Sequence, residues 1–307
     1  TNMKRIAIHS VPRSGSSWLG QIFNSSSKTC FRFQPLFSYA FKSCLHEKSS
    51  QEDISVFYER IAESDDDFLL QRDKVENGEY PSFSKEGEFT HIVYKEVRYH
   101  NIIKNMLTKD KDLKVIGLVR NPFAVISSFL NSPREFRKDL GWKEIEEWKF
   151  AEKKNLSKPE EFFGYEKWKE VYFIFKELEK EFQDRFCVVY YDDLIEDTIK
   201  EVQRIFDFCD LDVNTQTKDF IKNSNSAKNK KIYSEDELKM PIPEYLREYI
   251  QLTEIHYMTA ASLEHIFPEH NEKHMVFPQI YDFLRRRNIE QKKEEMVEEV
   301  VEEEEVV

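Results

Sequence analysis

The chain of 307 residues is 40% hydrophobic and 14% aromatic, enough apolar material to bury the core of one large domain. Its formal net charge of −12 is concentrated in residues 290–307, which hold nine Glu and two Lys, so the rest of the chain is only mildly acidic. This balance disfavours nucleic acid as a partner, and no stretch of eighteen uncharged apolar residues predicts a membrane span. We expect a cytoplasmic protein whose oligomeric state is left open.

Strand-like apolar runs alternate with segments of helical periodicity along the chain. The runs are Arg5–Ser10, Phe89–Val97, Lys114–Val119 and Phe186–Tyr191. They precede predicted helices at Ser16–Asn24, Tyr99–Leu107, Pro122–Leu130 and Asp197–Phe208. This repetition favours right-handed βαβ units. We therefore predict an α/β fold with a P-loop-like parallel sheet flanked by helices on both faces, built as a single domain with helical insertions.

A long helix, two insertions and an acidic tail complete the predicted domain organisation. A long helix follows Pro159, where aromatic and aliphatic residues recur every three or four positions from Phe162 to Phe182, as expected for a core-facing stripe. Two polar, aromatic-rich insertions, residues 34–85 and 132–158, interrupt the alternation and are predicted to shape a substrate cleft. We assign residues 1–270 to the domain and residues 271–307 to a helical or disordered acidic tail.

The stretch HSVPRSGSSWLGQIFNSS, from His9 to Ser26, has the pattern of a phosphate-binding loop. A turn between the first strand and a helix presents backbone N–H groups to an anion. Pro12 and Gly15 shape this turn, serine hydroxyls add donors, and Arg13 adds a fixed charge. The Walker pattern fails at its first glycine and its lysine. A serine-rich turn that merely caps the helix is the alternative.

A second stretch, KVIGLVRNPFAVISSFLNS, places Arg120 at the end of a predicted buried strand. Asn121 and Pro122 then begin a helix, and Ser128 follows eight residues after the arginine. By itself this pattern is also compatible with an arginine that simply reaches solvent. The four cysteines are scattered without metal-ligand spacing, so no metal site is predicted.

Together, PRSGSSW and LVRNPFAVISSF resemble the two cofactor-binding elements of sulfotransferases that use 3′-phosphoadenosine-5′-phosphosulfate (PAPS), and most closely those of the carbohydrate branch, both Golgi-type and bacterial. The segments FRFQPLFSYAF and VVYYDDLIED extend the similarity over roughly residues 4–230. The resemblance implies a P-loop-like fold and in-line transfer of a sulfuryl group from PAPS to a small-molecule or glycan hydroxyl, with a carbohydrate as the expected acceptor. The other product is 3′-phosphoadenosine-5′-phosphate (PAP). The resemblance implies no metal ion.

The resemblance also implies a role for individual residues. The loop around the 5′-phosphosulfate is Arg13, Ser14, Gly15, Ser16, Ser17 and Trp18. Arg120 and Ser128 correspond to the residues that hold the 3′-phosphate. Arg13 stands where many relatives carry lysine, so its expected catalytic role is electrostatic. The basic run NSNSAKNKK corresponds in type to a nucleotide-covering loop, with Lys228, Lys230 and Lys231 as candidates; a solvated charged loop is the alternative.

The general base is where the sequence departs from the carbohydrate branch. Relatives there usually carry a glutamate before the proline that follows the loop helix, whereas this chain has Gln34 before Pro35. An amide cannot accept the acceptor's proton, so Gln34 is expected to bind the acceptor by hydrogen bonds. Glu96 is the first candidate base and His100 the second. The alternatives are a salt bridge from Glu96 to Lys95 or Arg98, a helix-cap role for His100, and a base other than these two residues.

Two other functions are compatible with the sequence. Asp192 and Asp193, in a strand-like segment that resembles a Walker B strand, favour a P-loop kinase or NTPase that uses ATP and magnesium, but the missing Walker lysine opposes it. Gln34 in place of a base is also compatible with a nucleotide-binding protein that has no catalytic activity.

Overall fold

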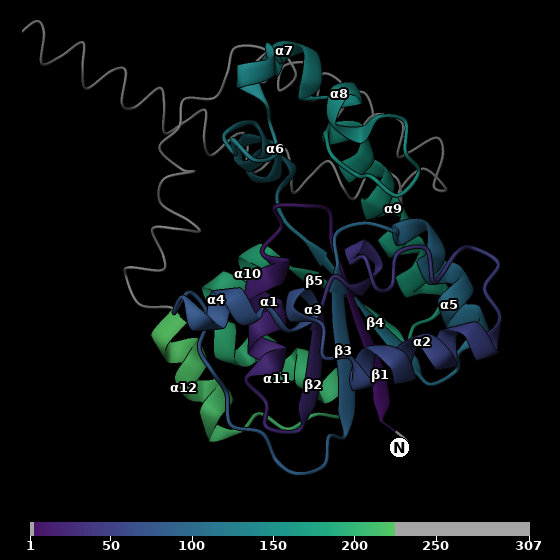
Figure 1. Ribbon diagram of the computed structural model, residues 1–307, viewed down its shortest axis with the longest axis vertical. Helices are drawn as coiled ribbons and strands as arrows, with labels where there is room; N and C mark the ends of the chain where they lie inside the picture. The colour runs from purple at the N-terminus through teal and green to yellow at the C-terminus, as the bar shows by residue number, and fades with distance from the viewer. Residues whose placement is uncertain (1–2, 225–307) are drawn as a thin grey trace, which may run out of the picture. The chain divides into compact units, whose positions relative to one another are not determined.

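The computed structural model describes residues 3–224, in which five short strands form one parallel sheet (Figure 1). The strands are β1 (Lys4–His9), β2 (Thr29–Phe33), β3 (His91–Glu96), β4 (Leu113–Val119) and β5 (Phe186–Tyr190). Their order is β2-β3-β1-β4-β5, and every neighbouring pair is parallel. The four predicted strands are confirmed to within two residues at each end, whereas the edge strand β2 was not predicted from the sequence.

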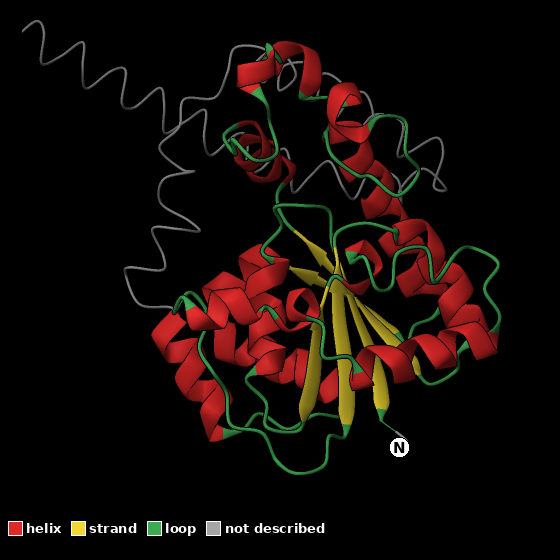
Figure 2. Ribbon diagram, viewed as in Figure 1, coloured by secondary structure: helices red, strands yellow, loops and turns green. Residues whose placement is uncertain are grey.

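Helices cover both faces of the sheet, as predicted (Figure 2). One face is covered by α1 (Ser16–Asn24), α10 (Tyr191–Glu196), α11 (Thr198–Phe208) and α12 (Thr215–Ser224). The other face is covered by α2 (Gln51–Glu63), α5 (Ile103–Lys109) and α9 (Tyr165–Glu181). The predicted helix Tyr99–Leu107 divides into the 3-10 turn η2 (His100–Ile102) and α5.

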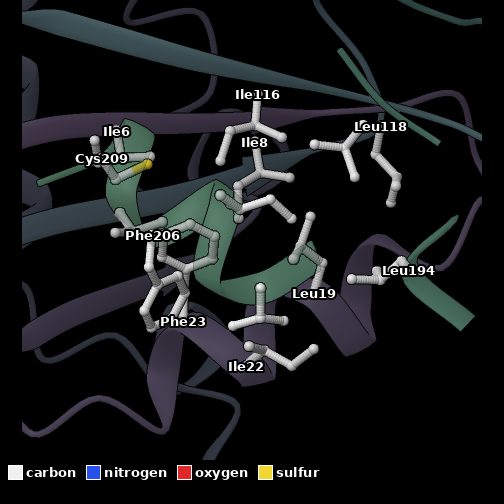
Figure 3. Packing of buried hydrophobic residues seen from close by; sticks show 14 of the residues in the cluster. Ile6, Ile8, Leu19, Ile22, Phe23, Ile116, Leu118, Leu194, Phe206 and Cys209 are labelled. Atoms are coloured by element: carbon white, nitrogen blue, oxygen red, sulfur yellow. The ribbon is translucent and has the colours of Figure 1, made fainter. Parts of the chain in front are cut away.

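The core on the α1 side is a continuous apolar cluster (Figure 3). Ile6 and Ile8 of β1 point to this side because alternate strand residues face opposite ways. Phe23 of α1 packs on Phe206 of α11 with ring centroids 4.8 Å apart. Cys209 is a free, buried thiol in the same cluster. This packing fixes α1, and with it the loop that precedes α1, against the sheet.

The two insertions contain further helices, one of which, α2, packs over a face of the sheet with Phe57 against Tyr94. The first contains η1 (Pro35–Phe37), α2, α3 (Asp67–Leu70) and α4 (Arg72–Glu76). The second follows α6 (Pro122–Leu130) and contains η3 (Lys138–Leu140), α7 (Glu144–Glu147) and α8 (Glu152–Asn155) (Figure 1). The aromatic stripe of α9 is buried, which confirms its predicted place in the core.

Some sequence predictions fall outside the described residues. These are the domain boundary at residue 270, the acidic tail, and the three candidates Lys228, Lys230 and Lys231. Within residues 3–224, no helix is both long and apolar enough to cross a membrane.

Gly117 of β4 offers a test of the packing between the sheet and α9. A Cβ at this position lies 2.7 Å from the Phe175 ring and 2.9 Å from the Phe186 ring, too close for either ring to stay in place. We expect Gly117→Ala to lower the free energy of unfolding by about 1–3 kcal/mol, the usual cost of overpacking. Gly87→Ala is the matched control, because nothing lies within 4 Å of a Cβ there. Equal urea midpoints for the two variants would contradict the packing described.

Candidate functional site

The loop between β1 and α1 contains two residues with a left-handed backbone conformation. Arg13 has φ 70° and Gly15 has φ 88°, both in the left-handed region. Two features exclude a side chain at Gly15: its positive φ, and the Tyr191 ring, which would lie 2.5 Å from a Cβ there. Leu19 N donates to Gly15 O at 3.2 Å, so the N–H groups of residues 16–18 have no carbonyl partner within the helix. This arrangement favours a bound anion.

A cavity of about 380 Å³ opens over this loop. Eight residues predicted from the sequence line it: Arg13, Gly15, Ser16, Ser17, Trp18, Gln34, Arg120 and Ser128. Six further residues also line it: Pro12, Lys74, Tyr80, Lys95, Val97 and Glu135. Segments that are far apart in the chain therefore meet at one place, as the predicted parallel sheet requires.

The two sequence elements that carried the resemblance are joined directly. Arg13 Nε donates to Ser128 Oγ at 2.9 Å, and Arg120 Nη1 donates to the carbonyl of Arg13 at 3.2 Å. The Arg120 guanidinium lies 4.5 Å from the centroid of the Tyr191 ring. Trp168 Nε1 of α9 donates to the Arg120 carbonyl at 3.0 Å, so the aromatic stripe also fixes the backbone at the end of β4.

Lys95 is the principal site residue that was not identified from the sequence. Its Nζ lies 2.9 Å from Ser16 Oγ, 3.3 Å from Ser17 Oγ and 4.7 Å from the centroid of the Phe33 ring. The residue is 2% exposed, and burial of the ammonium lowers the pKa of Lys95 to about 7. Its amine therefore lies where a phosphate-binding lysine is expected, although it comes from a strand and not from the loop.

The charges on the cavity wall are mainly positive. Arg13, Lys74, Lys95 and Arg120 line the cavity, with Glu135 as the one carboxylate among the described lining residues. Glu135 forms an ion pair with Lys154 at 2.6 Å. Lys74 forms an ion pair with Glu79 at 3.1 Å. The wall therefore suits a ligand that carries several negative charges.

Glu96, the first candidate base, lies away from the cavity. It follows Lys95 on β3, so its side chain points to the opposite face of the sheet, where it is fully buried. Its Oε1 accepts a hydrogen bond from Leu36 N at 2.7 Å, while Oε2 has no partner among the described residues. Burial raises the pKa of Glu96 to about 8. Arg98 pairs with Glu161 at 2.8 Å, so the salt-bridge alternative with Arg98 is not observed.

His100, the second candidate base, is also fully buried away from the cavity wall. Its Nδ1 lies 3.0 Å from Nδ1 of His9, whose Nε2 lies 3.0 Å from the Tyr94 hydroxyl. Burial lowers the pKa of His100 to about 3, so the imidazole is neutral at physiological pH. This cluster joins the ends of β1 and β3 beneath the loop.

Gln34 reaches the cavity through an unusual backbone conformation. Its φ of 41° is left-handed, its N–H donates to Lys95 O at 3.0 Å, and its side chain lines the cavity. The Glu96 carboxylate accepts from Leu36 N in η1, the turn that directly follows Gln34. This bond fixes the backbone next to Gln34 on the side away from the cavity.

Three other predicted residues do not line the cavity. Ser14 is fully buried, and its Oγ has no partner among the described residues. Asp192 and Asp193 lie in the first turn of α10 and are not among the lining residues either. In residues 3–224 no group of three His, Cys, Asp or Glu side chains is placed to hold a metal ion.

Comparison with known proteins identifies the family. The model of the sulfotransferase family matches residues 5–215, and this chain belongs to that family. No curated protein sequence matches it.

Several solved structures have a similar fold. A mouse sulfotransferase, SULT7A1, complexed with PAP, is 14% identical, with coverage of 81% of this chain and 83% of that chain at a TM-score of 0.47. The sulfotransferase domain of the Synechococcus PCC 7002 olefin synthase is 20% identical, and the match covers 80% of this chain and 84% of that chain with a TM-score of 0.39. The sulfotransferase domain of the curacin biosynthetic pathway is 17% identical, and the match covers 69% of this chain and 75% of that chain with a TM-score of 0.42. The family assignment rests on the family model.

Glu96→Gln distinguishes a positioning role from a catalytic base. The amide oxygen can still accept from Leu36 N, so we expect the variant to fold and to keep most activity, whereas Glu96→Ala loses the hydrogen bond and both stability and activity. A loss of activity in Glu96→Gln as large as in Glu96→Ala, measured by initial rates, would instead support the base.

The same variant has a predicted pH signature. Folding raises the pKa of Glu96, so its protonated carboxyl adds to the free energy of unfolding. This contribution is fully present below about pH 4 and is lost as the pH rises through about 8. We expect Glu96→Gln to gain stability relative to the original protein over this window, by up to about tenfold in the folding constant per pH unit. Thermal melts from pH 5 to pH 9 measure the difference, and a constant difference would contradict a raised pKa.

Proposed function

We propose that the protein is a PAPS-dependent O-sulfotransferase that transfers a sulfuryl group to a hydroxyl acceptor. The observation that carries the proposal is the cavity itself. The N-terminus of α1, two serine hydroxyls, Arg13, Lys95 and Arg120 converge there from three separate strand ends. A nucleotide that carries both a 3′-phosphate and a 5′-phosphosulfate has the charge that this wall requires.

Different parts of the wall suit different groups of the donor. Ser16, Ser17 and the first N–H groups of α1 are placed to hold the 5′-phosphosulfate, together with Lys95 and Arg13. We assign the 3′-phosphate to Arg120 and Ser128, which also line the cavity. The hydrogen bond from Arg13 to Ser128 joins the two sets and keeps the Arg13 guanidinium at the cavity. Bound PAPS supplies the activated sulfuryl group.

The residues act by charge and position. Sulfuryl transfer, like phosphoryl transfer, proceeds in line through a loose transition state, so catalysis consists mainly of orientation and electrostatic stabilisation. A sulfuryl group carries less charge than a terminal phosphoryl group. The cations of the cavity can therefore neutralise the bridging oxygen and the phosphate without a metal ion, and we propose metal-independent turnover.

We further propose a carbohydrate as the acceptor, on the strength of the resemblance and of the groups beside Gln34. Phe37 is 49% exposed and carries the Arg98 guanidinium 4.1 Å from its ring centroid, and Tyr80 lines the cavity with the Lys74 amine 5.2 Å from its ring centroid. We assign these two rings to contact with the apolar face of a sugar. Phe41 and Trp148 of the insertions are instead buried and belong to the core. A glycan or small polyol places one hydroxyl near Gln34 and a ring face against these aromatics.

Arg120→Ala tests the donor site. The variant loses charge-assisted hydrogen bonds worth about 1.5–3 kcal/mol, so we expect PAP to bind about ten- to a hundred-fold more weakly. Calorimetry in the presence of EDTA measures the loss and the metal independence together. Arg137→Ala is the control, because Arg137 is partly exposed and paired with Asp139. If the original protein binds ATP only with magnesium and does not bind PAP, the chain is instead a nucleotide kinase or NTPase.

Gln34→Ala tests the acceptor side. Removal of a neutral hydrogen bond of about 0.5–1.5 kcal/mol is expected to raise the KM for the acceptor by about two- to twelve-fold. The Kd for PAP stays unchanged, because only the acceptor contact is lost. The measurement uses labelled PAPS with a panel of sugars, phenols and aliphatic alcohols. Weaker PAP binding in the variant, with acceptor KM unchanged, would place Gln34 on the donor side.

A further inference from the structure

Lys95 is a buried lysine whose amine has only neutral partners in the described part of the protein. Its Nζ contacts the hydroxyls of Ser16 and Ser17 and the face of the Phe33 ring. Among residues 3–224 no carboxylate forms an ion pair with this amine. Burial of an ammonium without a paired anion is costly, and the cost is avoided when the amine is deprotonated.

The charged groups around Lys95 reinforce this state. Glu96, its neighbour on β3, attracts the proton but points to the other face of the sheet and is bound to Leu36 N. Arg98 and Lys74 repel the ammonium. Arg13 and Arg120 add positive charge to the same wall. Glu135 is engaged by Lys154.

We propose that Lys95 is a neutral amine in the empty cavity and binds the sulfuryl donor, or its product PAP, as an ammonium ion formed by uptake of one proton from solvent. The inference rests on the proposed function, because it requires a phosphate-bearing ligand beside the Ser16 and Ser17 hydroxyls. The proton adds to the amine lone pair when the anion enters and returns to solvent when PAP leaves.

The physical reason is the change of partner at Nζ. In the empty cavity burial holds the pKa of Lys95 at about 7, so the amine is largely neutral at pH 8 and above. A dianionic phosphate within hydrogen-bond distance favours the charged form and raises the pKa by several units. Binding and protonation are therefore linked, and the affinity for PAP falls as the pH rises above 7.

Calorimetry of the full-length protein with PAP measures the linkage. At pH 8.5 the phosphates of PAP are already ionised, since the second pKa of a phosphate monoester is about 6, and they release no proton on binding. Titrations in three buffers of different ionisation enthalpy then give the protons exchanged. We expect an uptake close to one proton at pH 8.5, and a Kd that weakens by up to about tenfold per pH unit between pH 7.5 and 9.5.

Two variants assign the proton to this residue. Lys95→Arg keeps the charge at every pH, so uptake is expected to fall to near zero while PAP still binds. Lys95→Gln has no charge at any pH, so PAP is expected to bind more weakly at pH 7 and with no pH dependence above it. Circular dichroism confirms that each variant is folded. If Lys95→Arg does not fold, the pH dependence of the Kd of Lys95→Gln for PAP tests the inference. A Kd that still weakens above pH 7 in Lys95→Gln would overturn it.

The outcomes separate this inference from the proposed function. No PAP binding by the original protein overturns the proposed function. Tight PAP binding without proton uptake shows that Lys95 is already charged and overturns the inference alone. The same uptake in Lys95→Arg as in the original protein assigns the proton to another group, and this also overturns the inference.

Discussion

The parallel hydrogen bonding of β1 with β3 and β4 fixes the positions of Arg13, Lys95 and Arg120 in the cavity. Ile8 is in register with Lys95, and His9 is in register with both Glu96 and Gly117, so all three strands end at nearly the same height. The loop after β1, the amine at the end of β3 and the guanidinium after β4 therefore meet without any long side chain having to span the sheet. A shift of one residue in the pairing would exchange the faces of Lys95 and Glu96 and place a carboxylate among the serines.

Packing of helices α1 and α9 holds the ends of the strands in place around the cavity. The apolar side of α1 is packed against β1, β4 and α11, so the unpaired N–H groups at its first turn cannot move away from the strand ends. On the other side of Arg120, Trp168 of α9 holds the backbone carbonyl. Because cations gathered in one cavity repel each other, their positions must be maintained by packing and hydrogen bonds when no anion is bound.

The sequence predicted the parts of the site that depend on local chemistry. The limits of α1 and α6 and the positions of Arg13, Arg120 and Ser128 follow from turn residues and from strand-to-helix changes, which leave a clear local pattern. Strand β2, with the sequence TCFRF, was not predicted because it is five residues long and joins the sheet only through β3. Lys95 was missed for a related reason. All six residues of β3 are buried, so hydrophobic alternation could not show which of Lys95 and Glu96 faces the loop.

The neutral amide at Gln34 and the buried acid at Glu96 are two parts of one electrostatic arrangement. A carboxylate at position 34 would stand on the cavity wall near Lys95, where it would form an ion pair with the amine and lower the affinity of the wall for anions. With glutamine at this position the wall keeps its positive charge. The carboxylate of Glu96 instead accepts from Leu36 N behind the turn, so it shapes the wall without sharing the cavity. The chain thus separates the acid that supports the turn from the amine that faces the cavity, because Glu96 and Lys95 lie on opposite faces of β3.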